Sequence, residues 1–288
     1  MRLALAASAR GPGSIAAPLA TVVDAVGELV GRMPDSLAPD AARWERIDAA
    51  RIERGALERA CWPHGVDWAL LPEAAAWSDY ALLAMDMDST LITIECVDEI
   101  ADCAGRRAEV AALTEAAMRG EIVDYSDSLR RRVALLAGLD ESVLERVYAE
   151  RLRLTAGAEA LVRAAQAAGL RILLVSGGFT YFTGRLVERL SLDHAASNRL
   201  EIVDGRLTGR LLGPIVDARA KAAELERQCA LLGVSTARAI AIGDGANDLA
   251  MMAAAGLSVA FRAKPVVRAR ASAAIQAGGL DVLLRWLD

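Results

Sequence analysis

The stretch "ALLAMDMDSTLITIE", residues 81–95, decides the fold. An apolar run, 81–85, ends in Asp86 and Asp88, and a second apolar run follows. Burying an isolated carboxylate costs much free energy unless a counter-charge lies beside it. The run therefore predicts a buried strand whose carboxyl end holds two carboxylates for a reason other than packing.

Further apolar runs follow at intervals, and each is bounded by glycine or by polar residues. We expect strands in "LRILLVSGG" (170–178), "RAIAIGDGAND" (238–248) and "GLSVAF" (256–261). Helical patterns are at 158–168, 180–191, 219–232, 247–255 and 265–272. Strands that alternate with helices predict an α/β fold with a doubly wound, mostly parallel, Rossmann-like sheet.

Three segments depart from this alternation. "RLEIVDGRLTGRL" (199–211) predicts a hairpin that turns at Asp204-Gly205. The pattern between Glu95 and about residue 154 is wholly helical, so we expect a helical cap, about 95–155, inserted after the first core strand. Residues 1–78 hold four of the five tryptophans and predict a small N-terminal α+β domain ahead of a domain over 79–288.

Composition excludes several classes of protein. The net charge of −5 shows no basic excess, so we expect no nucleic-acid partner. The uncharged stretches 11–23 and 249–261 are too short to span a bilayer, so we expect no membrane partner. Four cysteines without a CxxC pair favour free thiols in a reducing compartment. We therefore expect a soluble, cytoplasmic protein.

Polar side chains gather where the predicted strands end. They are Asp86 and Asp88; Ser176, Gly177 and Gly178; and Asp244, Asn247 and Asp248. In open α/β sheets, ligands bind outside the carboxyl ends of the strands. Carboxylates there suit Mg²⁺, and a hydroxyl beside glycines before a helix suits a phosphate.

Lysine occurs only at positions 221 and 264, because arginine supplies the other basic residues. Lys221 lies near the start of the helix that leads into the 238–248 strand, where it could place a point charge on a phosphate. Each feature also has an ordinary interpretation: a turn aspartate, a simple glycine turn, a solvated lysine. The combination of all three favours a phosphate and metal site.

This constellation resembles the haloacid dehalogenase superfamily of phosphotransferases. It is carried by "DMDST" (86–90), Ser176, Lys221 and "GDGAND" (243–248), in the family's order. The resemblance implies that Asp86 attacks phosphorus and that Asp88 acts as general acid and base. It implies a Mg²⁺ ion on the Asp86 side chain, the Asp88 carbonyl and Asp244. Phosphate binding falls to Ser176, Gly177, Lys221 and Asn247, with Asp248 as a supporting residue.

Within that superfamily, "DMDSTLITIECVDEIAD" (86–102) and "AAMRGEIVDYSDSLRRRVALL" (116–136) are similar to phosphoserine phosphatases. This implies a small-molecule substrate, L-phosphoserine, hydrolysed in the last step of serine biosynthesis. Glu95 would face its ammonium and Arg132 its carboxylate, and Met118 and Gly178 would shape the pocket. Two departures are a one-residue longer stretch between Met118 and Arg132, and Tyr125 where phenylalanine is usual.

Other interpretations stay open from the sequence. A relative in the same superfamily could act on another phosphomonoester or transfer phosphate to an alcohol. A phospho-signalling receiver also uses a strand-end aspartate, a hydroxyl and a lysine, and a binding protein without activity is a third alternative. Residues 3–30 resemble the opening of ACT-type regulatory domains, which bind amino acids, but a scaffolding or homodimerisation domain fits residues 1–78 equally well.

Overall fold

Eleven strands form one continuous sheet in the computed structural model, which describes residues 1–7, 16–73, 75–118 and 124–287. Across the sheet the strands run in the order β2-β3-β1-β4-β11-β10-β9-β5-β6-β7-β8. The six strands from β11 to β7 are parallel to their neighbours, and the pairs at both flanks are antiparallel. The predicted doubly wound, mostly parallel sheet is confirmed.

The core strands occupy the apolar runs that the sequence marks. They are β5 (Leu82–Met85), β6 (Arg171–Phe179), β7 (His194–Val203), β8 (Arg206–Leu212), β9 (Ala239–Gly243), β10 (Leu257–Phe261) and β11 (Ala273–Ile275). The helices between and after them are α7 (Ala158–Ala167), α8 (Thr180–Leu190), α9 (Ala218–Leu231), α10 (Leu249–Ala254), α11 (Pro265–Arg268) and α12 (Val282–Leu287). Strands β7 and β8 form the predicted hairpin at Asp204-Gly205.

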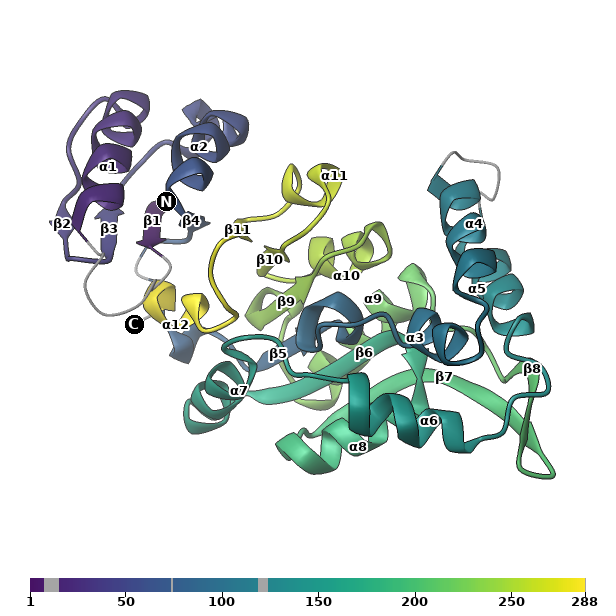
Figure 1. Cartoon of the computed structure of the whole chain (residues 1–288). Helices are drawn as coiled ribbons and strands as arrows, with labels where there is room; N and C mark the ends of the chain where they lie inside the picture. The colour runs from purple at the N-terminus through teal and green to yellow at the C-terminus, as the bar shows by residue number, and fades with distance from the viewer. Residues whose placement is uncertain (8–15, 74, 119–123, 288) are drawn as a thin grey trace.

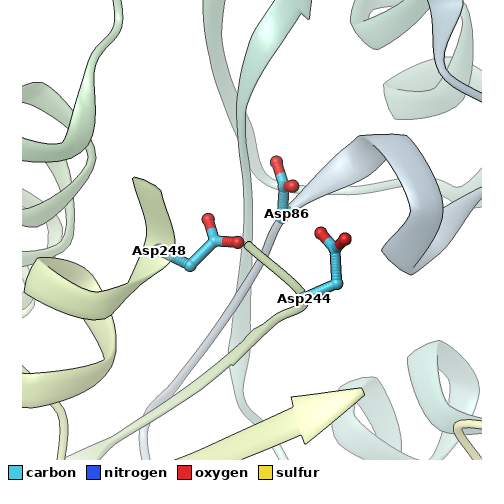
Figure 2. A group of neighbouring side chains, drawn as sticks. All are labelled: Asp86, Asp244 and Asp248. Carbon is cyan, nitrogen blue, oxygen red and sulfur yellow. The ribbon is translucent and has the colours of Figure 1, made fainter. Parts of the chain in front are cut away.

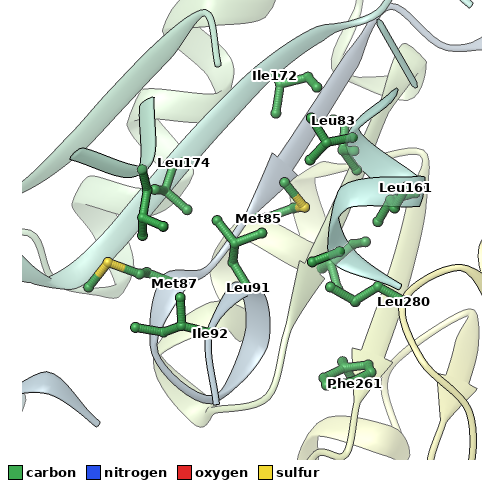
Figure 3. Packing of buried hydrophobic residues seen from close by; sticks show 14 of the residues in the cluster. Leu83, Met85, Met87, Leu91, Ile92, Leu161, Ile172, Leu174, Phe261 and Leu280 are labelled. Carbon is green, nitrogen blue, oxygen red and sulfur yellow. The ribbon is translucent and has the colours of Figure 1, made fainter. Parts of the chain in front are cut away.

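Alternate residues of the central strands pack on opposite faces of the sheet, as the period of two requires. Leu83 and Met85 of β5 join one hydrophobic cluster with Ile172 and Leu174 of β6, and Figure 3 shows Leu161 of α7 near Leu83 in this cluster. Leu82 and Ala84 face the other cluster. Because both faces are covered, the strands read as continuous apolar runs in the sequence.

The N-terminal segment adds its own strands to this sheet. Its elements are β1 (Arg2–Ala7), α1 (Ala16–Val30), β2 (Ser36–Leu37), β3 (Ala41–Trp44), α2 (Arg54–Cys61) and β4 (Val66–Leu71). Strand β4 pairs antiparallel with β11, with Ala69 opposite Ala273. In Figure 1 the purple N-terminal segment lies beside the yellow C-terminal one, and Arg2 donates a hydrogen bond to the Trp286 carbonyl (2.6 Å).

Strand β11 and the end of α11 differ from the sequence expectation. We expected a helix over 265–272, but α11 ends at Arg268 and the chain turns into β11. Three residues, two of them alanine, give too short an apolar run to separate from a helical pattern. This difference matters for the whole sheet, because β11 is the strand with which β4 of the N-terminal segment pairs.

The helical cap follows β5 and a π-helical turn, η4 (Met87–Leu91). It contains α3 (Cys96–Cys103), α4 (Arg107–Met118), α5 (Tyr125–Ala134), α6 (Ser142–Arg146) and a second π turn, η5 (Val147–Arg151). Helices α4 and α5 pack together and stand beyond the strand ends in Figure 1. Among the described residues, no helix has the length and apolar character needed to cross a membrane.

Candidate active site

Asp86 and Asp88 leave the carboxyl end of β5 on a tight turn. All four residues of β5 are buried, and Asp86 continues the sheet by donating its N–H to the Ile242 carbonyl (3.0 Å). The π turn then begins, and Ser89 within it has a φ of 55°. Asp86 is 4% exposed and Asp88 is half-buried, so the strand delivers both carboxylates to one crowded edge of the sheet.

Lys221 reaches this edge from the first turns of α9. Its Nζ donates to Oδ1 of Asp86 (2.6 Å) and to Oδ1 of Asp248 (2.7 Å), and its side chain has no exposed surface. A buried ammonium needs paired carboxylates. One ammonium offsets only one of the two negative charges, so the cluster keeps a net negative charge.

Three aspartates converge around that lysine. Asp86, Asp244 and Asp248 each offer one oxygen atom, and these atoms lie within 4.8 Å of one another (Figure 2). Both oxygens of Asp248 already accept hydrogen bonds, Oδ1 from Lys221 and Oδ2 from the Gly245 N–H (3.0 Å). Asp86 and Asp244 are therefore the carboxylates best able to bind a cation directly, with Asp248 in support.

The pKa values of these carboxyl groups rise for two reasons. Burial, and then the Asp248 carboxylate, raise the pKa of Asp86 well above its usual range. The same two causes raise the pKa of Asp244 to about 6. Carboxylates crowded together out of water need a further positive charge, and oxygen-only ligands suit a hard divalent cation. The donor set thus fits a divalent metal ion.

Asp88 follows Asp86 by two residues and faces Ser176. Its Oδ2 accepts a hydrogen bond from Ser176 Oγ (3.4 Å), and its Oδ1 accepts one from the Cys96 N–H (2.9 Å). Burial raises the pKa of Asp88, and the hydrogen bonds from Cys96 and Ser176 oppose that rise. Ser176 Oγ also accepts from the Gly178 N–H (2.8 Å), so β6 fixes the hydroxyl beside the carboxyl group.

Glycines are required where the site is tightest. A Cβ on Gly178 would lie 2.6 Å from Asp88 Oδ2, and one on Gly245 would lie 2.2 Å from Asn247 Oδ1. Real Cβ atoms do not approach other atoms this closely, so a side chain at either position would displace Asp88 or Asn247. Gly178 thus packs against Asp88, and Gly245, which follows Asp244, packs against Asn247.

The cap contributes one acidic and one basic side chain. Glu95 accepts a hydrogen bond from Ser89 Oγ (2.8 Å) at the start of α3. Although much of this residue is exposed, desolvation by the surrounding protein, and then the Asp88 carboxylate, raise the pKa of Glu95 to about 8. Arg132 of α5 is half-buried, and among the described residues its Nε has no hydrogen-bond partner. Arg132 also lies close enough to Asp98 to act on its carboxyl group, so the cap holds its basic side chain beside an acidic one.

Met118 is the last residue of α4, and its side chain lies outside the part of the chain that the structure describes. Sequence reasoning also missed two contacts. The Cys96 N–H bonds Asp88, and the Ser89 hydroxyl bonds Glu95. The only available signal was the position of Cys96 in the first turn of a predicted helix, where N–H groups lack helical partners.

Comparisons with known proteins agree with this geometry. Residues 83–253 match the haloacid dehalogenase-like hydrolases. Over 211 residues the chain is 60% identical to a phosphoserine phosphatase of Polaromonas sp. (strain JS666 / ATCC BAA-500), a match that covers 72% of this chain and 89% of that protein.

Solved structures give the same family. The unliganded crystal structure of a probable phosphoserine phosphatase from Vibrio cholerae has a TM-score of 0.79 and 37% identity, covering 99% of this chain and 86% of that one. A phospho-aspartyl intermediate analogue of phosphoserine phosphatase has a TM-score of 0.68 and 37% identity, covering 73% of this chain and 99% of that one. The chain is similar over 89% of their length to two phosphoserine phosphatases, and it belongs to the haloacid dehalogenase-like hydrolases.

Proposed function

We propose that the protein hydrolyses L-phosphoserine to L-serine and phosphate through an aspartyl-phosphate on Asp86, with Mg²⁺ as cofactor. The observation that carries this proposal is the buried Lys221, which joins Asp86 to Asp248, while Asp88 at the same strand end accepts a hydrogen bond from Ser176 of the adjoining strand. Those groups supply a nucleophile, an acid–base residue and phosphate donors in one site. Identity of 60% to a phosphoserine phosphatase supports the substrate.

The metal site uses the oxygens that the protein leaves available. Asp86 and Asp244 side chains and the backbone carbonyl of Asp88 would hold Mg²⁺, which prefers oxygen ligands. When bound, Mg²⁺ offsets the negative charges of Asp86 and the phosphoryl group, so that the two can approach. Asp248 keeps Lys221 in place beside this site through its Oδ1.

The reaction proceeds in two displacements, which is nucleophilic catalysis. An oxygen of Asp86 attacks phosphorus, while Asp88 gives a proton to the departing serine oxygen. Asp88, now ionised, takes a proton from water, and the resulting hydroxide attacks the phosphorus of the aspartyl-phosphate and frees Asp86. Ser176 Oγ, the Gly177 N–H, Lys221 and Asn247 hold the phosphoryl oxygens throughout.

The cap reads the amino-acid part of the substrate. Phosphoserine carries one ammonium and one carboxylate. The cap offers a carboxylate on Glu95 and a guanidinium on Arg132. Glu95 lies among carboxylates that raise its pKa, so an added ammonium is favourable there. The Arg132 guanidinium fits a carboxylate with two parallel hydrogen bonds. Met118 and Gly178 complete the walls of the pocket.

The first test is phosphate release from a panel of phosphoserine, phosphothreonine, sugar phosphates and p-nitrophenyl phosphate, with and without Mg²⁺. We expect phosphoserine to have the highest kcat/KM and no turnover in EDTA. A higher kcat/KM on a sugar phosphate would contradict the assignment of phosphoserine as the substrate. Adding alcohol acceptors separates hydrolysis from phosphate transfer, and a receiver protein would show no multiple turnover.

The second test is Asp86→Asn, which keeps the side chain's shape but removes the nucleophilic carboxylate. We expect kcat to fall by a factor on the order of 10⁴ or more, as for other nucleophile replacements. Acid-quenched wild-type protein should carry a phosphoryl group on Asp86, detectable by mass spectrometry, and the variant should not. Near-normal turnover of Asp86→Asn would exclude the covalent step.

A further inference from the structure

Tyr125, the first residue of α5, brings a phenol from the cap onto the phosphate edge of the sheet. Its ring packs against the larger hydrophobic core. Its Oη lies directly over Gly177: a Cβ on that glycine would be 1.8 Å from Oη and 3.0 Å from Cζ. The cap can therefore seat this tyrosine only because residue 177 has no side chain. Cap and core touch here at the middle residue of the Ser176-Gly177-Gly178 sequence.

The hydroxyl of Tyr125 has no hydrogen-bond partner among the described residues, although the ring is packed between cap and core. The charged groups that act on it are Lys221, Arg132, Asp86 and Asp88, all of them in the proposed site. Burial raises the pKa of Tyr125 to about 12, so the group remains a neutral O–H donor at neutral pH. The residue is only half-buried, and a ligand oxygen bound beside Gly177 would lie next to this hydroxyl as an acceptor.

A purely packing role would be served by phenylalanine, which the wider resemblance predicts at this position. The added oxygen is what makes the tightest contact with Gly177, so it fills space beside the backbone that receives the phosphoryl group. The substrate's carboxylate has its own donor in Arg132. Because the Tyr125 hydroxyl lies beside Gly177, the phosphoryl group is the part of the substrate that would accept its hydrogen bond.

We propose that the Tyr125 hydroxyl donates a hydrogen bond to a phosphoryl oxygen of the bound ligand, so that seating of the cap on Gly177 completes the phosphate-binding set. The proposal rests on the proposed function for the identity of the substrate. The contact between the Tyr125 hydroxyl and phosphate does not depend on which phosphate ester is the substrate. Tyr125 is then a substrate-binding residue supplied by the cap, alongside Ser176 and Lys221 from the core.

The test is Tyr125→Phe, with Tyr148→Phe in the η5 turn of the cap as the matched control. Binding of inorganic phosphate is measured by calorimetry in the presence of Mg²⁺, and kcat/KM is measured on phosphoserine and on p-nitrophenyl phosphate. Loss of a hydrogen bond to a charged group should weaken phosphate binding about tenfold or more and lower kcat/KM on both substrates by a similar factor. Tyr148→Phe should change none of these quantities.

Unchanged phosphate affinity in Tyr125→Phe would overturn the proposal, and so would a loss confined to phosphoserine, which would place the hydroxyl on the amino-acid end. Thermal unfolding of both variants shows whether the fold is kept. If the wild-type protein binds phosphate but does not hydrolyse phosphoserine, the proposed function fails. The phosphate-binding comparison still decides the role of Tyr125 in that case.

Discussion

The Nζ atom of Lys221 lies 2.6 Å from Oδ1 of Asp86, with both side chains buried at the end of β5. The same Nζ donates to Asp248, so a single ammonium links α9 to two segments that are far from it in sequence. Removing one member of a buried ion pair leaves its partner without a counter-charge. The relationship therefore supports both the fold and the proposed chemistry.

Lys221→Met tests this link, and Lys264→Met, at the exposed second lysine, is its control. We expect Lys221→Met to lower the free energy of unfolding by about 3–5 kcal/mol, because two buried carboxylates lose their cation. Phosphatase activity should also fall by a factor on the order of 10³ or more, by analogy with other buried catalytic groups. Urea unfolding in EDTA and a phosphate-release assay give both values. Equal stability of the two variants would show that Lys221 is not the necessary counter-charge.

Arg132→Ala tests recognition of the substrate's carboxylate. We expect KM for phosphoserine to rise roughly 10- to 100-fold, as for loss of a charged hydrogen-bonded pair, with little change for p-nitrophenyl phosphate. Arg131→Ala is the matched control, because Arg131 is 55% exposed and pairs with Asp127 one turn earlier. Equal losses on both substrates would move Arg132 to a structural role.

The raised pKa values predict how the stability of the metal-free protein depends on pH. Ionisation of Asp244 costs stability, because its pKa is about 6 in the folded chain and near 3.8 unfolded. The folded state therefore binds the proton more tightly, and the free energy of unfolding rises as pH falls. For Asp244 the gain is at most about 3 kcal/mol between roughly pH 6 and pH 4. Glu95, with a pKa of about 8, acts in the same direction from pH 8 downward.

Thermal unfolding in EDTA between pH 8 and pH 5 measures this dependence. We expect Tm to rise toward pH 5, and added Mg²⁺ to raise Tm more at pH 8 than at pH 5, because a cation offsets ionised carboxylates. Asp244→Asn should flatten the lower part of the profile and weaken the response to Mg²⁺. A metal-free Tm that increases with pH would contradict the assignment.

Asp67→Ala tests how the N-terminal segment is attached. The Asp67 carboxylate is buried in β4 and accepts the N–H groups of Gln276 (2.7 Å), Ala277 (2.9 Å) and Gly278 (2.8 Å), just after β11. Leaving three N–H groups without an acceptor should cost about 3 kcal/mol or more of unfolding free energy. Asp40→Ala removes only a partly exposed pair with Arg285 and should cost less than about 1 kcal/mol. Similar denaturation midpoints for the two variants would disprove the difference.

The pairing of β4 with β11 also bears on how the chain is divided into domains. The predicted boundary at residue 78 stays a prediction, but β1 to β4 share one sheet with the core through the β4–β11 pair. One hydrophobic cluster contains both Trp68 of β4 and Leu82 of β5. Strands β1 to β4 therefore help to stabilise the sheet that holds the site.

Most of the core strands and the polar residues at their ends could be predicted from the sequence. The apolar runs that became β5, β6, β9 and β10 are buried on both faces, so their hydrophobicity is continuous and their ends are sharp. The parallel topology that such runs imply then brings the polar strand ends together. Asp86, Asp88, Ser176, Asp244 and Lys221 could be assigned to one site for that reason.

Tertiary structure alone decided what these residues touch. The pairing of β4 with β11, the hydrogen bond from Cys96 to Asp88, and the contact of Tyr125 with Gly177 join residues that are 8 to more than 200 positions apart in sequence. Local patterns do not specify the partners in such contacts, because these depend on which sheet edge is free and on how far a side chain reaches across a packed interface. The sequence thus determined most of the core strands and the edge of the sheet at which their charged residues lie. Tertiary packing determined which partner each charged side chain contacts.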